Sequence, residues 1–282
     1  MTDVAADIAA DDAQRAAGAR RRSPRVPYAL FVPAAVGILF LLLPLVGLLV
    51  RTPWRQLPEL ISGTAVRTAL RLSLETATAA TVIAIALGVP IAWVLARVTF
   101  PGRTLLRALI TLPLVLPPVA GGIALLMAYG RRGVVGGWMF KAFGVSLPFT
   151  TAAVIVAETF VAMPFLIVSV EGSLRGLDVR YDQAAATLGA SRWFTFRHVT
   201  LPMLAPGIAA GAVLCWARAL GEFGATITFA GSYPGTTQTM PVRVYLALQD
   251  DPNAAIALSF LLLVVSVAIL AGLRDRWLRP AT

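Results

Sequence analysis

Six long apolar runs separated by short polar segments constrain this 282-residue chain more than any other feature. The runs cover approximately residues 28–50, 68–97, 104–129, 150–170, 203–230 and 254–273. Each run reaches the roughly 20 residues that an α-helix needs to cross a bilayer. Membrane-spanning β-strands would be shorter and polar at every second position. We therefore expect an all-α polytopic membrane protein with six transmembrane helices.

The composition agrees with a membrane protein, because 58% of the residues are hydrophobic and only 13% are charged. Soluble domains carry about 25% charged residues. A net charge of +10 could suit a nucleic-acid-binding protein, but the charges lie between apolar runs and form no single basic face. The only cysteine, Cys215, leaves no partner for an intrachain disulfide or a CxxC site. We expect it to be a small buried side chain within its apolar run.

The segment 1–27 is polar and rich in alanine, with four Asp and five Arg residues, and we expect a disordered tail. The 23-residue run after it, 28–50, is too long for the apolar core of a signal peptide, and no small-x-small cleavage pattern follows it. We interpret it as a retained transmembrane anchor. The membrane domain would then cover residues 28–275.

The distribution of Lys and Arg predicts the orientation. With a cytoplasmic N-terminus, 15 of the 24 basic residues fall in inside segments and eight in outside segments, and Arg218 lies within a span. This bias of nearly two to one predicts that both termini are cytoplasmic. It also places the charged loop between the fourth and fifth spans, residues 176–202, at the cytoplasmic surface.

The loop 176–202 has the local chemistry of two short helices joined by a glycine. Asp178 can cap a first helix, whose alanine-rich body 183–188 favours helix. Gly189 stands where a helix C-terminus needs a left-handed residue. Ser191 can cap a second, amphipathic helix over 192–199, and Pro202 fits the first turn of the fifth span. The loop is therefore predicted to form a helix–Gly–helix elbow.

This elbow resembles the E-A-A-x3-G-x9-I-x-L-P motif of the permease subunits of bacterial ABC importers. The matching positions are Gln183, Ala184, Ala185, Gly189, Val199, Leu201 and Pro202. Two of them depart from the motif, because Gln183 replaces Glu, with Asp182 one position earlier, and Val199 replaces Ile. The Gln places in doubt any ion pair that the family Glu makes, but not the elbow itself.

The resemblance implies a type I ABC importer permease fold and an elbow that inserts into a groove of a separate ATPase subunit. Asp182 and the seven matching residues would form this coupling site. ATP and Mg would be bound by the partner, and the chain itself would hold no cofactor, no metal and no catalytic residue. The alternative is an interfacial helix that rests on lipid headgroups, with Arg192 and Arg197 on phosphates.

The sequence itself contains no P-loop for ATP. Its only lysine, Lys141, lies between Phe140 and Ala142 and not in a Gly-Lys-Ser/Thr motif. Its only histidine, His198, excludes an HExxH zinc site and lies within the elbow. These absences disfavour a membrane enzyme.

Three further segments resemble the molybdate branch of the oxyanion importers: residues 72–97, 112–136 and 216–245. The discriminating features are Arg131-Arg132-Gly133 after the third span, and 221–231 followed by Thr237-Gln238-Thr239-Met240-Pro241. This resemblance favours molybdate and does not separate it from tungstate. A sulfate or thiosulfate permease remains an alternative, because those proteins share the start of the 221–231 segment.

Charged residues within spans point to function or to pairing. Arg218 and Glu222 are spaced i, i+4, as are Arg71 and Glu75. Either Arg218 and Glu222 line the path of a dianion, or the pair neutralises itself and orients its helix. Glu158 has no local partner, and we expect it to be protonated, paired or outside the path.

The resemblance implies a complex of two permease copies, predicted as a homodimer, with an ATPase dimer and an extracytoplasmic molybdate-binding protein in the bacterial inner membrane. Gly207 and Gly211 form a GxxxG pair that allows close helix crossing, with a partner in the same or another chain. An ion-coupled secondary transporter would be expected to show inverted repeats, and the two halves show no convincing repeat.

Overall fold

A computed structural model describes residues 30–178 and 180–277, with side chains described to residue 272. The predicted tail 1–27 lies outside the described residues. Every regular element in the described part is a helix, which confirms the all-α prediction. The chain divides into two units, Met1–Val50 and Arg51–Thr282. The first contains nearly all of α2 (Phe31–Arg51), which carries no charged residue before Arg51.

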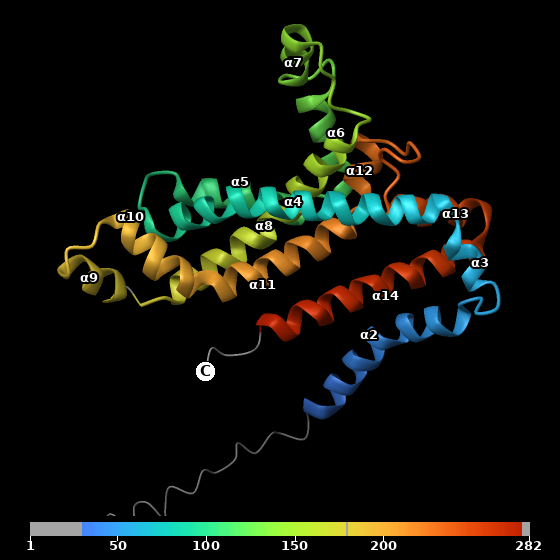
Figure 1. Cartoon of the computed structure of the whole chain (residues 1–282), viewed down its shortest axis with the longest axis horizontal. Coiled ribbons are helices and arrows are strands. Elements are labelled where there is room, and N and C mark those ends of the chain that lie inside the picture. Colours follow the sequence, from blue (N-terminus) through green and yellow to red (C-terminus); the bar gives the residue numbers. More distant parts are fainter. Residues whose placement is uncertain (1–29, 179, 278–282) are drawn as a thin grey trace, which may run out of the picture. The chain divides into compact units, whose positions relative to one another are not determined.

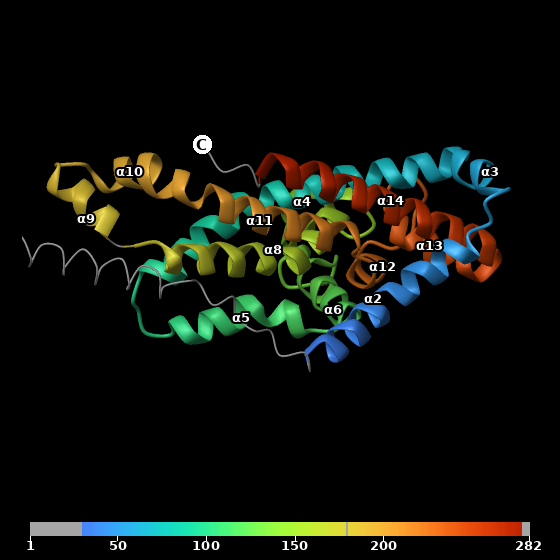
Figure 2. The same ribbon diagram turned by 90° about the horizontal axis from the view of Figure 1, so that it is seen from below.

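Three long helices form the centre of the second unit: α4 (Thr64–Arg97), α8 (Thr151–Gly176) and α11 (Leu201–Leu220). They lie side by side in both ribbon views (Figures 1 and 2), and their buried side chains form one cluster. Small residues allow this packing, because Ala77, Ala80 and Ala84 of α4 are fully buried. Without water to drive helices together, such close van der Waals contact is a main source of association in a bilayer.

The GxxxG pair of α11 packs against α8 of the same chain. A Cβ atom at Gly207 would lie 2.6 Å from Cβ of Ser173, and one at Gly211 would lie 3.0 Å from Cβ of Ser169. The Ser169 hydroxyl donates to the Gly207 carbonyl at 3.3 Å. The pair is therefore an intrachain crossing point.

Two of the six predicted spans are broken into separate helices. The run 104–129 forms α5 (Arg103–Val115) and α6 (Pro118–Tyr129), which are bent by 118°. Leu116 and Pro117 are extended at the break, as residues before proline prefer. The run 203–230 likewise ends its long helix at Leu220 and resumes as the short α12 (Gly224–Phe229).

The two breaks pack against each other, because α6 contacts α12. A Cβ at Gly122 of α6 would lie 2.8 Å from the Ala225 carbonyl oxygen, and one at Gly224 would lie 2.7 Å from Cβ of Pro118. A second buried cluster, which includes Leu125, joins these short helices to α8. Glycines thus let two irregular backbone segments approach closely inside the protein.

Outside the loop 176–202, the remaining described helices are α3 (Leu57–Ser62), α7 (Gly136–Phe143), α13 (Met240–Asp250) and α14 (Pro252–Trp277). Figure 1 shows α7 projecting away from the three central helices beyond α6, and α13 beside the N-terminal end of α4. The Ser73 hydroxyl fixes that end, since it accepts a hydrogen bond from the Met240 N–H at 2.7 Å.

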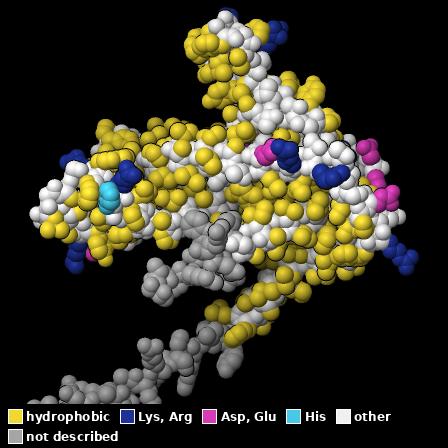
Figure 3. Space-filling model, in the orientation of Figure 1, with side chains coloured by type: hydrophobic (Ala, Val, Ile, Leu, Met, Phe, Trp, Pro, Cys, Tyr) yellow, Lys and Arg dark blue, Asp and Glu magenta, His cyan; other side chains and the backbone are white. Residues whose placement is uncertain are grey.

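Five helical stretches of the described chain are long and apolar enough to cross a membrane, and six if the bent α5–α6 pair counts as one span. The predicted six spans therefore require the bent pair. In Figure 3 hydrophobic side chains cover most of the visible face over the long helices, and most Lys and Arg side chains lie toward the helix ends. That distribution suits a lipid-facing surface.

Gly207→Ala should destabilise the protein by about 1–3 kcal/mol, because the added methyl group overpacks the contact with Ser173. The measurement is the midpoint of thermal unfolding in detergent. Gly172→Ala is the matched control, since a Cβ at Gly172 of α8 meets no atom within 4 Å. Equal midpoints for the two variants would contradict a crossing fixed at Gly207.

Candidate coupling site

The elbow forms as its local chemistry predicts. The first helix is α9 (Arg180–Thr187), and the Asp178 carboxylate accepts from the Arg180 N–H at 2.9 Å. Gly189 follows with a left-handed φ of 80°. The second helix begins as α10 (Arg192–Thr195), capped by Ser191, whose hydroxyl oxygen accepts from the Phe194 N–H at 3.2 Å.

The second helix does not end before the fifth span, as the separate segments 192–199 and 203–230 implied. It continues through a π-helical turn, η2 (Phe196–Thr200), directly into α11. Pro202 explains the turn, because a proline removes a backbone donor and its ring clashes with the carbonyl four residues earlier. In the wider turn the Leu201 N–H bonds to the Phe196 carbonyl instead. The second helix of the elbow is thus continuous with α11.

The predicted coupling residues divide by exposure. Four of them are exposed: Gln183, Ala184, Gly189 and Pro202. The other four are partly buried: Asp182, Ala185, Val199 and Leu201. The most exposed large hydrophobic side chains of the elbow, Leu188 at 87% and Trp193 at 69%, were not among the predicted residues. They follow the α9 body and begin the second helix, so the tip of the elbow is apolar.

Asp182 is the one predicted coupling residue with charged and polar partners outside its own helix. One oxygen of its carboxylate lies 3.6 Å from Nη2 of Arg97 at the end of α4. The other oxygen accepts a hydrogen bond from the Thr200 hydroxyl at 3.2 Å. Asp182 therefore connects α9 to both η2 and α4.

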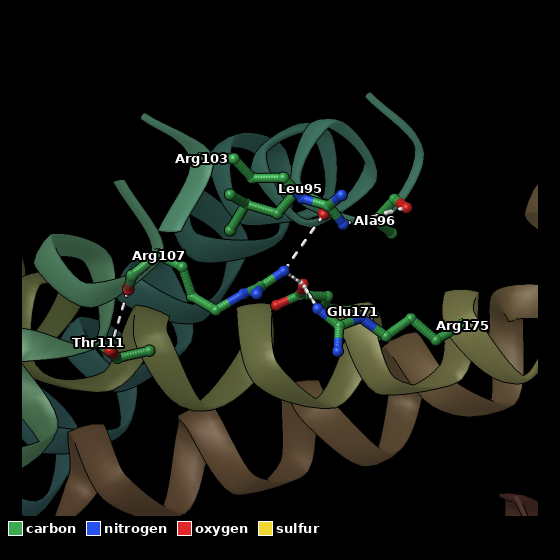
Figure 4. A network of polar contacts seen from close by, with 7 residues as sticks. All are labelled: Leu95, Ala96, Arg103, Arg107, Thr111, Glu171 and Arg175. Carbon is green, nitrogen blue, oxygen red and sulfur yellow. Dashed lines mark hydrogen bonds and ion pairs between the residues drawn. The ribbon is translucent and has the colours of Figure 1, made fainter. Parts of the chain in front are cut away.

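A second charged group lies beside this end of α4, between α4, α5 and α8 (Figure 4). Glu171 of α8, 6% exposed, pairs with Arg107 of α5 at 2.5 Å and with Arg175 at 2.7 Å. Arg107 and Arg103 also donate to the carbonyls of Leu95 and Ala96 at 3.4 and 3.5 Å. These carbonyls belong to the last turn of α4, where the helix supplies no partner.

Arg218 and Glu222 lie at the opposite end of α11 from the elbow. Nη1 of Arg218 is 2.6 Å from Glu222. The other Glu222 oxygen accepts from the Ala225 N–H at 2.8 Å, at the start of α12. Glu222 is 1% exposed, and the Arg218 side chain is 27% exposed. Glu222 therefore closes the break between α11 and α12 and pairs with the more accessible Arg218.

The structure also gives the partners or the burial of the other charged residues and the cysteine noted within the spans. Arg71 and Glu75 form an exposed ion pair at 2.6 Å on α4. Glu158 is paired with a residue that the sequence did not indicate, since the buried Thr76 hydroxyl donates to it at 2.9 Å. Cys215 is fully buried, as expected.

Sequence analysis missed the residues that tie the elbow and its neighbouring helices together: Arg97, Arg107, Glu171 and Thr200. The contacts Thr200–Asp182, Arg107–Glu171 and Arg97–Asp182 join residues 18 to 85 positions apart, and no helical or strand period relates such positions. The only available signal was their charge or polarity beside an expected cytoplasmic boundary.

A sequence profile described as "Binding-protein-dependent transport system inner membrane component" matches residues 84–280. The matched range contains the whole elbow, both helix breaks, all of α8 and α11, and the C-terminal part of α4 from residue 84. The chain belongs to this family. It is accordingly a membrane component of a binding-protein-dependent transport system, and the predicted permease resemblance is confirmed.

Relatives of this permease have named substrates. The "Molybdenum transport system permease protein ModB" of Mycobacterium tuberculosis strain H37Rv is 49% identical over 253 residues, covering 89% of this chain and 95% of the relative. The "Sulfate transport system permease protein CysT" of Escherichia coli K12 is 36% identical over 259 residues, covering 90% and 93%.

Solved structures support the fold of the permease. A chain of a bacterial ABC transporter involved in the import of the acidic polysaccharide alginate superposes with a TM-score of 0.72. The superposition covers 90% of this chain and 96% of that chain, at 18% identity. The ABC importer permease fold is therefore confirmed at the level of architecture.

Proposed function

We propose that this permease is the membrane-spanning subunit of an ATP-driven molybdate importer. The observation that carries the substrate is the 49% identity to the mycobacterial ModB along 95% of that relative. The sulfate permease CysT, at 36% identity over a similar length, makes sulfate or thiosulfate the second candidate. Molybdate and tungstate are tetrahedral dianions of nearly the same size, so the proposed path accepts both.

In this proposal the elbow 176–202 docks into a groove of a separate ATPase subunit. The docking surface is the exposed part of the elbow, with Gln183, Ala184 and Gly189 beside the apolar tip of Leu188 and Trp193. An exposed apolar tip suits insertion into a partner, because it is unfavourable in water. The partly buried side chains support this surface from the side of the permease: Ala185, Val199 and Leu201. Pro202 lies where the elbow joins α11, and the helix running from Arg192 to Leu220 carries the motion of the elbow into the membrane.

The proposed complex contains two copies of the permease, an ATPase dimer and an extracytoplasmic molybdate-binding protein. Both termini and the elbow face the cytoplasm. Two halves are needed for alternating access, since the path opens and closes as they rock against each other. ATP and Mg bind to the ATPase, so the permease performs no covalent chemistry and carries no cofactor.

Proteoliposomes test the proposal when they contain the permease, its ATPase and the molybdate-binding protein, with ATP on the ATPase side. We expect ATP-dependent uptake of labelled molybdate. An excess of unlabelled tungstate should inhibit this uptake, whereas the same concentration of sulfate should not. An uncoupler should leave uptake intact. Preferential uptake of sulfate would show that sulfate, and not molybdate, is the substrate. Uptake that needs no ATP and is abolished by an uncoupler would support an ion-coupled transporter.

Gly189→Val tests the elbow as the docking element. A β-branched residue is strained at a φ of 80°, at a cost of roughly 1–2 kcal/mol, so the two elbow helices should lose their relative placement. We expect loss of ATPase co-purification or of uptake while the spans still insert. Gly189→Asn is the matched control, because asparagine tolerates left-handed backbone, and it should retain most activity. Normal assembly and uptake for the valine variant would refute the docking role.

We also propose that Arg218, held by Glu222, contributes positive potential along the dianion path. Its partial exposure beside a fully buried carboxylate supports this assignment, because a partly accessible guanidinium can present positive charge to an anion. Arg218→Gln should reduce molybdate uptake about tenfold or more, consistent with an ionic interaction in a low-dielectric site, and Arg218→Lys should reduce it less. If Arg218→Gln assembled and transported normally, the pair would serve only to orient α11.

A further inference from the structure

The Asp182 carboxylate faces the body of the permease and not the exposed tip of the elbow. Its side chain is 38% exposed, whereas its neighbour Gln183 lies on the exposed face of α9. Both carboxylate oxygens have partners within the chain, one on Arg97 and one on Thr200. The negative charge of Asp182 therefore already has a cationic partner within the permease.

The contact with Thr200 closes the elbow on itself. Asp182 lies in the first turn of α9, and Thr200 ends η2, so the hydrogen bond joins the beginning of the elbow to its end. Thr200 is only 5% exposed, and the π-helical turn determines where its side chain lies. The two elbow helices are therefore held at a fixed separation around Gly189.

The contact with Arg97 fixes the closed elbow to α4. The Arg97 side chain is 19% exposed and extends from the last turn of α4. Trp93, one turn earlier on α4, makes an edge contact with Phe196 of η2 at 6.4 Å between ring centroids. The end of α4 thus holds both halves of the elbow, α9 through an ion pair and η2 through an aromatic contact.

We propose that Asp182 is a positioning residue that fixes the coupling elbow to α4, so that movement of the elbow displaces α4 together with α11. This inference rests on the proposed function, because it assigns Asp182 to transmission within the permease and not to contact with the ATPase. Without the Asp182 contacts, α9 follows the ATPase while α4 stays behind. ATP is then hydrolysed with less transport.

The reconstituted complex described above tests this inference through the amount of molybdate imported per ATP hydrolysed. Asp182→Asn keeps an oxygen for Thr200 but removes the ion pair with Arg97. We expect normal ATPase co-purification, retained ATP hydrolysis and about a threefold lower ratio, the factor that one partly exposed ion pair can supply. Thr200→Val removes the other contact and should lower the same ratio.

Two further variants make the test specific. The exchange Arg97→Asp with Asp182→Arg should restore much of the ratio that either single substitution lowers. Asp178→Asn is the matched control, since among the described residues the Asp178 side chain contacts only Arg180, two positions away, and asparagine keeps the cap. It should leave the ratio unchanged.

The outcomes separate the two proposals. An unchanged ratio of molybdate imported to ATP hydrolysed in Asp182→Asn overturns the positioning role. Loss of ATPase co-purification that the Arg97–Asp182 exchange fails to restore also overturns it, because this result would indicate a direct contact between Asp182 and the ATPase. If Asp182→Asn does not fold, Thr200→Val and the charge exchange decide by the same ratio. Absence of ATP-dependent uptake by the unmodified complex overturns the proposed function instead.

Discussion

The arrangement of this permease depends on one constraint of the bilayer: every backbone N–H and C=O at membrane depth needs a partner within the protein. Long helices meet that need internally, but the chain also contains two breaks, at Leu116–Pro117 and between Leu220 and Gly224. The breaks are placed against each other through glycine contacts between α6 and α12, and the Glu222 carboxylate accepts one of the freed N–H groups. Irregular backbone of this kind is tolerated where it is buried or lines a path, which is also where a transporter needs it.

The same need for partners organises the other end of the central helices. The last carbonyls of α4 accept from Arg103 and Arg107, and Arg107 is held in turn by Glu171 of α8. Arg97, in the same turn of α4, extends to the elbow. The end of one helix is therefore the meeting point of α5, α8 and the elbow. The elbow is thus connected to these elements through polar side-chain contacts at the end of α4.

Much of this architecture could be predicted from the sequence because its determinants are local. Run length predicted the spans, Ser191 predicted a cap, and the position of Gly189 predicted left-handed backbone. Pro117 and Pro118 predicted a kink in the third span but not its break into α5 and α6, since a proline in a membrane helix can equally produce a mild kink. The π-helical turn before Pro202 was missed for the same reason. Thr76–Glu158 and Arg97–Asp182 could not be predicted at all, because only the packing of α4 brings such distant residues together.

The departure from the family motif at Gln183 has a structural consequence. The two acidic residues of the elbow, Asp178 and Asp182, both face cations of this chain, Arg180 and Arg97. With a neutral Gln183 on the exposed face, the elbow offers an ATPase no unpaired carboxylate, but an apolar tip flanked by basic side chains such as Arg192. A complementary groove would be apolar at its floor and acidic at its rim. Recognition would then rest on burial of Leu188 and Trp193, with charge adding selectivity and association rate more than affinity.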